Sequence, residues 1–167
     1  KVLLQQISDL YEKHRTAEEE ERVAIYKQID SISGLAAQYV AANEYDQMAS
    51  SLGAEGTNAF TSLDRTVYIN DIPSNEVEKW LKLESERFDE LVLRLFHTEL
   101  EAVYEEYNIA QGKDGRKVFA AFLKGLLPNH PYGTQTTLGT GEHLKTPSMQ
   151  KIHEYFNTYY VPNNMSI

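Results

Sequence analysis

The chain has 167 residues, a length that fits one domain with a substantial hydrophobic core. Its formal net charge of −9 argues against nucleic-acid binding, because phosphate contacts need a basic surface. Eleven tyrosines and six phenylalanines argue against disorder, and the absence of cysteine excludes disulfides and thiolate-bound zinc. No apolar run approaches the length of a membrane span.

The first 33 residues or so have the periodicity of helices. Apolar side chains recur every three or four residues from Leu3 to Ile32. Thr16 fits the N-cap of a second helix, because the acidic run Glu18–Glu21 would then lie in its first turn and favour the helix dipole. Gly34 interrupts the pattern. We therefore predict a helical hairpin with the acidic run on its solvent-exposed side.

The next part of the chain changes from helical to strand-like periodicity. Residues 36–52 form a third predicted helix, which ends at Gly53 in the usual C-cap position. The runs 57–62 and 65–70 are short and rich in β-branched and aromatic residues, and only two residues separate them. This arrangement predicts a β-hairpin.

Helical patterns return after the hairpin. Pro73–Glu76 has the signals of a helix start, and an apolar stripe follows from Val77 to Leu95. His97 or Thr98 marks a predicted joint, where a histidine has a structural role. A further helix then carries the acidic stretch 99–106.

The last third of the chain is predicted to contain two more helices. After a loop that contains Gly112 and Gly115, residues 118–127 are helical again. The predicted elements that follow are a proline- and glycine-rich loop over 128–147, an amphipathic helix over 148–160, and a strand that starts at 161.

Two carboxylates in the acidic stretch form a candidate site. Glu99 and Glu106 are seven residues apart, which is almost two helical turns, so both side chains point to one face. A carboxylate presented in this way can bind a metal ion, and a second one can support the metal ligands. On spacing alone a solvated acidic face is the better interpretation, since the helix also carries Glu101 and Glu105.

Four segments between residues 48 and 167 carry a resemblance to a known family. In chain order they are Gly56–Tyr68 with its Asn58-Ala59-Phe60-Thr61 core, the helix Glu99–Glu106, the loop His130-Pro131-Tyr132-Gly133 with Leu138-Gly139, and Tyr159–Met165 with its Pro162-Asn163-Asn164 core. In this order they resemble the pitrilysin, insulysin and mitochondrial processing peptidase family of zinc metallopeptidases, the inverzincins.

The resemblance implies a zinc site and a substrate-binding edge. In that family a His-x-x-Glu-His helix supplies two zinc ligands and a general base, and a Glu on the next helix completes the site. Glu106 would be that zinc-binding Glu, and Glu99 would be the carboxylate that supports it. Zinc would activate water to attack a peptide bond. Asn58, Ala59 and Phe60 would form the sheet edge on which a peptide substrate binds as an added strand.

The chain departs from the family pattern because it lacks His-x-x-Glu-His. None of its five histidines, at 14, 97, 130, 143 and 153, is four residues from another. The motif would have to precede Lys1, and both ends of the chain read as cuts through a larger protein. Residues 1–45 would then be an inserted helical hairpin, and residues 46–167 a partial peptidase-family domain. We expect this fragment alone to be inactive and free of zinc.

The predicted fold is α+β, an antiparallel-type sheet with helices packed on one side. The resemblance makes it a partial LuxS/MPP-like metallohydrolase with an inserted N-terminal helical hairpin. The expected function of the parent protein is zinc-dependent endopeptidase activity. Its expected partners are peptide substrates and either the remaining halves of the same peptidase or a partner subunit, without nucleic acid and without a membrane span.

Two other functions stay open at this point. The first is a non-catalytic homologous domain or subunit that serves as a scaffold or holds peptides. The second, a purely helical interaction domain, is disfavoured by the predicted β-hairpin. The compartment is also open: periplasmic or secreted if the parent carries a signal peptide, and otherwise cytoplasmic or organellar.

Overall fold

The computed structural model describes residues 1–167 as helices and one two-stranded antiparallel sheet, so the α+β class is as predicted. The chain divides into two compact units, each built from two stretches of sequence. The first unit contains residues 1–38 and 94–148, and the second contains residues 39–93 and 149–167. The domain assignment stays a prediction, with residues 1–45 as an insertion and residues 46–167 as a partial peptidase domain.

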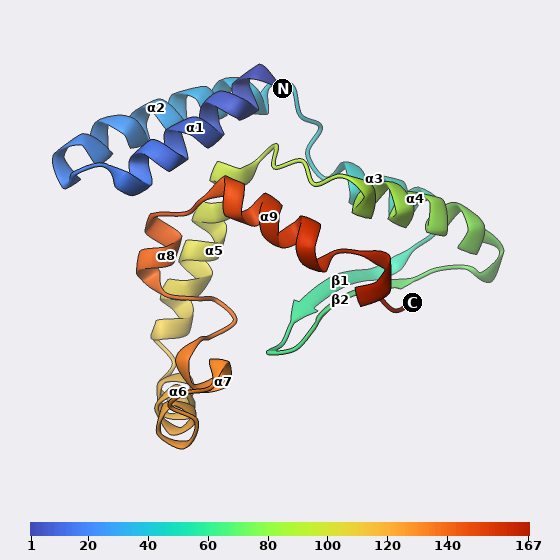
Figure 1. Ribbon diagram of the computed structural model, residues 1–167. Helices are drawn as coiled ribbons and strands as arrows, with labels where there is room; N and C mark the ends of the chain where they lie inside the picture. Colours follow the sequence, from blue (N-terminus) through green and yellow to red (C-terminus); the bar gives the residue numbers. More distant parts are fainter. The chain divides into compact units, whose positions relative to one another are not determined.

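The first unit begins with the predicted helical hairpin. Helices α1 (Val2–Thr16) and α2 (Glu19–Ala37) lie side by side, as Figure 1 shows. They bury Ile7 and Tyr11 from α1 and Ile29 from α2, which gives the hairpin an apolar core. The hairpin is therefore held by side-chain burial, which supplies most of the stability of helices in proteins.

Two details of the predicted hairpin are wrong. Thr16 is the last residue of α1 and caps no helix, because its hydroxyl donates to the carbonyls of Glu12 and Lys13 in its own last turn. Gly34 lies inside α2, which continues to Ala37. A glycine costs a helix only about 1 kcal/mol, and the burial of Ala36 after it favours continuation.

The rest of the first unit is also helical. It contains α5 (Phe96–Gln111), α6 (Asp114–Leu126), α7 (Pro131–Thr134) and α8 (Gly141–Lys145). The short helices α7 and α8 lie in the region predicted to be a loop. Pro131 starts α7 because its fixed φ suits a first helical position, and the Thr140 side chain accepts a hydrogen bond from the His143 N–H at the start of α8. α7 contacts α6, and α8 contacts α5.

The second unit combines a β-hairpin with helices. It contains α3 (Glu44–Ser51), β1 (Glu55–Thr61), β2 (Thr66–Asp71), the 3-10 turn η1 (Ser74–Glu76), α4 (Val77–Asp89), α9 (Met149–Tyr159) and the 3-10 turn η2 (Pro162–Asn164). Gly53 follows α3 with a φ of +83°, so the predicted glycine C-cap is confirmed. The predicted β-hairpin is confirmed as well.

Two predicted boundaries and one predicted strand in or next to the second unit differ from the structure. The third helix starts at Glu44 and not at residue 36, because α2 extends to Ala37 and a turn follows. The joint predicted at His97 or Thr98 lies earlier, between the end of α4 at Asp89 and Phe96. The strand predicted from residue 161 is wrong. Pro162 has no N–H for a strand ladder, and the Asn164 N–H closes a turn to the Val161 carbonyl.

The register of the hairpin sets which side chains share a face. Ala59 pairs with Tyr68, while Asn58 pairs with Ile69 on the opposite face. On the Tyr68 side the sheet meets helices, because Tyr68 packs on Phe88 of α4. On the other side Phe60 and Ile69 are exposed. Helix α4 therefore covers the part of this face around Tyr68 in β2, while β1 stays exposed along its whole length.

Candidate functional site

The structure places Glu99 and Glu106 in one regular helix, as the sequence predicts. Both belong to α5, and the seven-residue step separates them by roughly 20° around the helix axis. Both side chains are exposed, whereas Ala110, one turn beyond Glu106, is buried. The two carboxylates therefore lie along the edge of the buried stripe of α5, where a further helix or a ligand can reach them.

The described residues do not complete a zinc site around this pair. No group of three or more His, Asp or Glu side chains in the chain is placed to hold a metal ion. His97, the histidine of α5, is nine residues before Glu106, which is two and a half turns, so it points to the opposite side of the helix. Catalytic zinc takes three protein ligands, and Glu106 would supply only one of them. The residues present therefore do not fit zinc by themselves.

The second predicted group, Asn58 to Phe60, lies on an edge strand. All three residues are exposed, and β1 pairs only with β2, so its outer edge faces no other strand. Such an edge can pair with an added peptide strand. The side-chain oxygen of Asn58 accepts a hydrogen bond from the Ala59 N–H at 2.8 Å, so a peptide strand would compete with this contact for that N–H. β1 belongs to the second unit, and α5 to the first.

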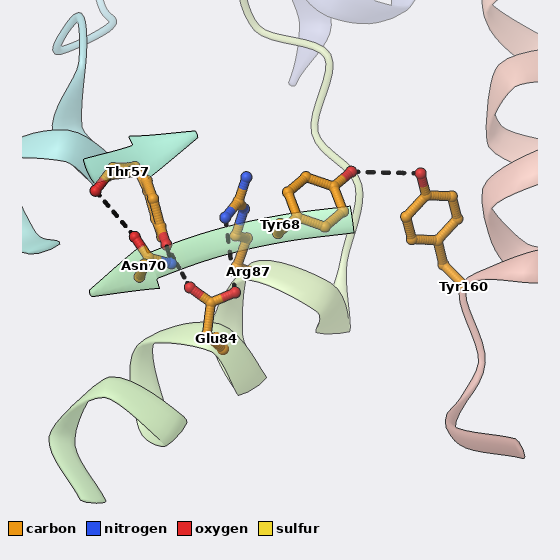
Figure 2. A network of polar contacts seen from close by, with 7 residues as sticks. Thr57, Tyr68, Asn70, Glu84, Arg87 and Tyr160 are labelled. Carbon is orange, nitrogen blue, oxygen red and sulfur yellow. Dashed lines mark hydrogen bonds and ion pairs between the residues drawn. The ribbon is translucent and has the colours of Figure 1, made fainter. Parts of the chain in front are cut away.

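A polar network that the sequence did not predict joins the β-hairpin to helices α3 and α4 (Figure 2). The Thr57 hydroxyl donates to Asn70 Oδ1 at 2.9 Å, and Asn70 Nδ2 donates to the Tyr45 hydroxyl at 2.8 Å. Tyr45 in turn donates to the buried carboxylate of Glu84. These hydrogen bonds run without a break from β1 through β2 and α3 to α4.

Arg87 neutralises the buried end of this network. Its guanidinium lies 3.6 Å from a Glu84 carboxylate oxygen, 4.1 Å from the centre of the Tyr45 ring and 4.4 Å from that of Tyr68. Both rings attract the cation through their negative faces, and a planar guanidinium suits this stacking. The Tyr68 hydroxyl lies 3.3 Å from that of Tyr160. The network therefore ties β1 and β2 to α3 and α4 within the second unit.

The sequence pattern around Glu84 and Arg87 gives little indication of this network. Glu84 and Arg87 are three residues apart in α4, a spacing that many exposed helical ion pairs share. Only the burial of Glu84 distinguishes the pair, and burial depends on Tyr45 and Tyr68, which lie elsewhere in the sequence.

Alkaline pH is expected to weaken the second unit through Tyr68. Burial, followed by the hydrogen bond with Tyr160, raises the pKa of Tyr68 to about 12. The folded state therefore keeps this proton after the unfolded chain has lost it. The stabilisation is complete below about pH 10, the pKa of an unfolded tyrosine, and is lost as the pH rises towards 12.

Urea unfolding between about pH 8 and pH 11.5 would measure this loss. The Tyr68→Phe variant should lose stability less steeply with pH than the wild-type protein, because it has no phenol at this position. Tyr39→Phe is the matched control, since Tyr39 is 83% exposed. Equal slopes for Tyr68→Phe and the wild-type protein would contradict the assignment to Tyr68.

Comparisons with known proteins add no relative. No protein-family model, no curated protein and no solved structure matches this chain. None of its helices is both long enough and apolar enough to cross a lipid bilayer. A function for this chain is therefore inferred from its own residues and contacts.

Proposed function

We propose that this chain is part of a zinc-dependent endopeptidase of the pitrilysin, insulysin and mitochondrial processing peptidase family, with a LuxS/MPP-like domain. The observation that carries the proposal is the position of Glu99 and Glu106 on one exposed face of α5. Its other support is the order of the four family-like segments along the chain, from the Asn58-Ala59-Phe60 strand to the Pro162-Asn163-Asn164 turn.

In this proposal Glu106 is a zinc ligand and Glu99 supports the ligand shell. The two histidine ligands and the general base come from a His-x-x-Glu-His helix that residues 1–167 do not contain. With these histidines, Glu106 would hold a zinc ion, which would supply a hydroxide nucleophile near neutral pH. Glu106 contributes an anionic oxygen, and Glu99, about two turns earlier on the same face, can accept a hydrogen bond from a neighbouring ligand.

The same proposal gives the β-hairpin a substrate role. A peptide substrate would add to the outer edge of β1 beside Asn58, Ala59 and Phe60, with backbone hydrogen bonds supplying affinity. The edge is accessible, because all seven residues of β1 are exposed. The Thr57–Asn70–Tyr45 hydrogen bonds hold this strand on its helices while the edge stays open.

The proposed partners are the remaining halves of the same peptidase or a partner subunit. Helix α6 exposes four large apolar side chains along one side. They are Val118, Phe119, Phe122 and Leu126. A contiguous apolar face of this kind is typical of contact with another protein surface. It supports a chain that functions as part of a larger assembly.

The alternative function is a non-catalytic homologous domain or subunit that holds peptides or serves as a scaffold. The exposed edge of β1 favours it, because strand addition needs no metal. The two functions differ in zinc content and in peptide cleavage by the full-length protein. Both quantities, measured for the wild-type protein and for Glu106→Gln, test the proposal. A full-length protein with neither zinc nor cleavage would favour the scaffold.

A further inference from the structure

Helix α6 of the first unit is exposed to solvent on almost every side. Every residue from Asp114 to Leu126 is exposed except Leu123, which is half-buried. The helix contacts α5 and α7, and the backbone at its end lies close to Gly133 of α7. Packing within the unit therefore does not explain the distribution of apolar and charged side chains around α6.

One side of α6 is apolar. Its four large apolar side chains fall within an arc of about 100° around the helix axis. They are Val118, Phe119, Phe122 and Leu126, and each is between 59% and 69% exposed. A helix ordinarily turns an apolar stripe of this width towards a core. Here the stripe is open, which marks it as a contact surface for another molecule.

The rest of α6 is basic, although the net charge of the chain is −9. Four basic residues and one acidic residue lie between the N-cap and the end of the helix, and they are Lys113, Arg116, Lys117, Lys124 and Asp114. Lys117 and Lys124, two turns apart, point roughly away from the apolar arc. The pair of Lys117 with Asp114 spans 3.7 Å between exposed side chains and is therefore weak. The surface around α6 thus attracts anions in an otherwise acidic chain.

An anionic lipid surface complements both sides of this helix at once. A helix that lies in a membrane interface buries its apolar side about 5–10 Å into the boundary between headgroups and acyl chains, and lipid headgroups then surround its polar side. The long stems of lysine and arginine carry their charges to the lipid phosphates. A protein docked on the apolar side would leave Lys117 and Lys124 in solvent. The positions of the charges therefore favour a lipid surface over a protein partner.

We propose that α6 is an interfacial helix that attaches this chain to an anionic lipid bilayer. Its apolar side enters the boundary of the acyl chains, and Arg116, Lys117 and Lys124 lie among the headgroups. The helix lies along the membrane surface and does not cross it. The proposal goes beyond the peptidase function and does not depend on it.

The acidic remainder of the chain is compatible with this attachment. At physiological ionic strength charges are largely screened beyond about 8 Å, so the lipid surface acts chiefly on the residues beside it. Each lysine or arginine close to an anionic bilayer strengthens binding by roughly fivefold. Burial of the apolar side chains adds to this electrostatic attraction. Attachment should therefore require both the apolar and the basic side of α6.

Vesicle binding by the 167-residue chain tests the proposal. Co-sedimentation is compared for vesicles of phosphatidylcholine alone and for vesicles in which about a third of the lipid is phosphatidylglycerol, at about 0.15 M salt. The wild-type protein should bind the anionic vesicles roughly tenfold or more tightly than the neutral ones, because several basic residues act together.

Two double variants separate the two sides of the helix. Phe119→Gln with Phe122→Gln removes apolar surface, and Lys117→Gln with Lys124→Gln removes charge. Each should weaken binding to anionic vesicles by roughly tenfold or more. The four side chains are exposed, so circular dichroism should show an unchanged helix content in both proteins.

The control changes one apolar and one basic residue of another exposed helical surface. Val23→Gln with Lys27→Gln, both at exposed positions in α2, should bind like the wild-type protein. Equal binding of the wild-type protein to both kinds of vesicle, or unchanged binding in either α6 variant, overturns the proposal. Absence of binding to anionic vesicles overturns it as well, and leaves the apolar side of α6 to a protein partner.

Discussion

Glu106→Gln in the full-length protein is expected to remove most of the bound zinc and to lower peptide cleavage by about a hundredfold or more. Glutamine keeps the shape of the side chain but replaces an anionic ligand with a neutral amide, which holds zinc poorly. The fold should not change, because Glu106 is exposed at the surface of α5. Metal analysis and the cleavage of a fluorogenic peptide measure the two effects, and the melting temperature checks the fold.

Glu105→Gln is the matched control for this experiment. Glu105 is exposed in the same helix and loses the same charge, but it points about 100° away from Glu106. Its variant should keep both zinc and activity. Glu99→Gln should have an effect between those of the other two variants. Removal of a residue that supports a metal ligand typically lowers metal affinity or activity by roughly 10- to 100-fold. Equal zinc content and equal cleavage in Glu106→Gln and Glu105→Gln would rule out Glu106 as the ligand.

Local pattern was enough to predict the elements that carry the candidate site. The β-branched runs on either side of Leu63 and Asp64 form the hairpin, and the apolar steps around Glu99 and Glu106 form α5. In both cases the signal lies within a few neighbouring residues, where side-chain periodicity and turn residues decide the conformation. The side-chain positions within these elements follow directly from their geometry.

The contacts between elements could not be predicted in this way. Tyr11 and His97 are 86 residues apart, and Tyr45 and Glu84 are 39 apart, so no local period connects them. His97 was expected to have a structural role at a helix joint, and its contact with Tyr11 of α1 forms only when these helices pack. The strand expected from residue 161 failed for a related reason, because a strand needs a neighbour to bond with and the described chain provides none there.

Gly133→Ala is expected to destabilise the first unit by about 2 kcal/mol or more. A Cβ at this position would lie 2.1 Å from the Leu127 carbonyl oxygen and 2.8 Å from that of Leu123. Both are backbone atoms, so no side-chain rotation relieves the overlap. The same two oxygens accept hydrogen bonds that form the end of α6 and the turn into α7, from the N–H groups of His130 and Leu127. Moving them would break these bonds.

Gly125→Ala separates this steric effect from the general effect of adding a methyl group. A Cβ at Gly125, in the last turn of α6, meets no atom within 4 Å apart from the nearby backbone of its own helix. Alanine there should stabilise the protein by up to about 1 kcal/mol through helix propensity. Urea unfolding followed by circular dichroism compares the variants, and a Gly133→Ala protein as stable as Gly125→Ala would contradict the close approach of α7 to the end of α6. Gly133 belongs to the His130-Pro131-Tyr132-Gly133 segment of the family resemblance. Close packing therefore explains a glycine at this position, whether or not the protein binds zinc.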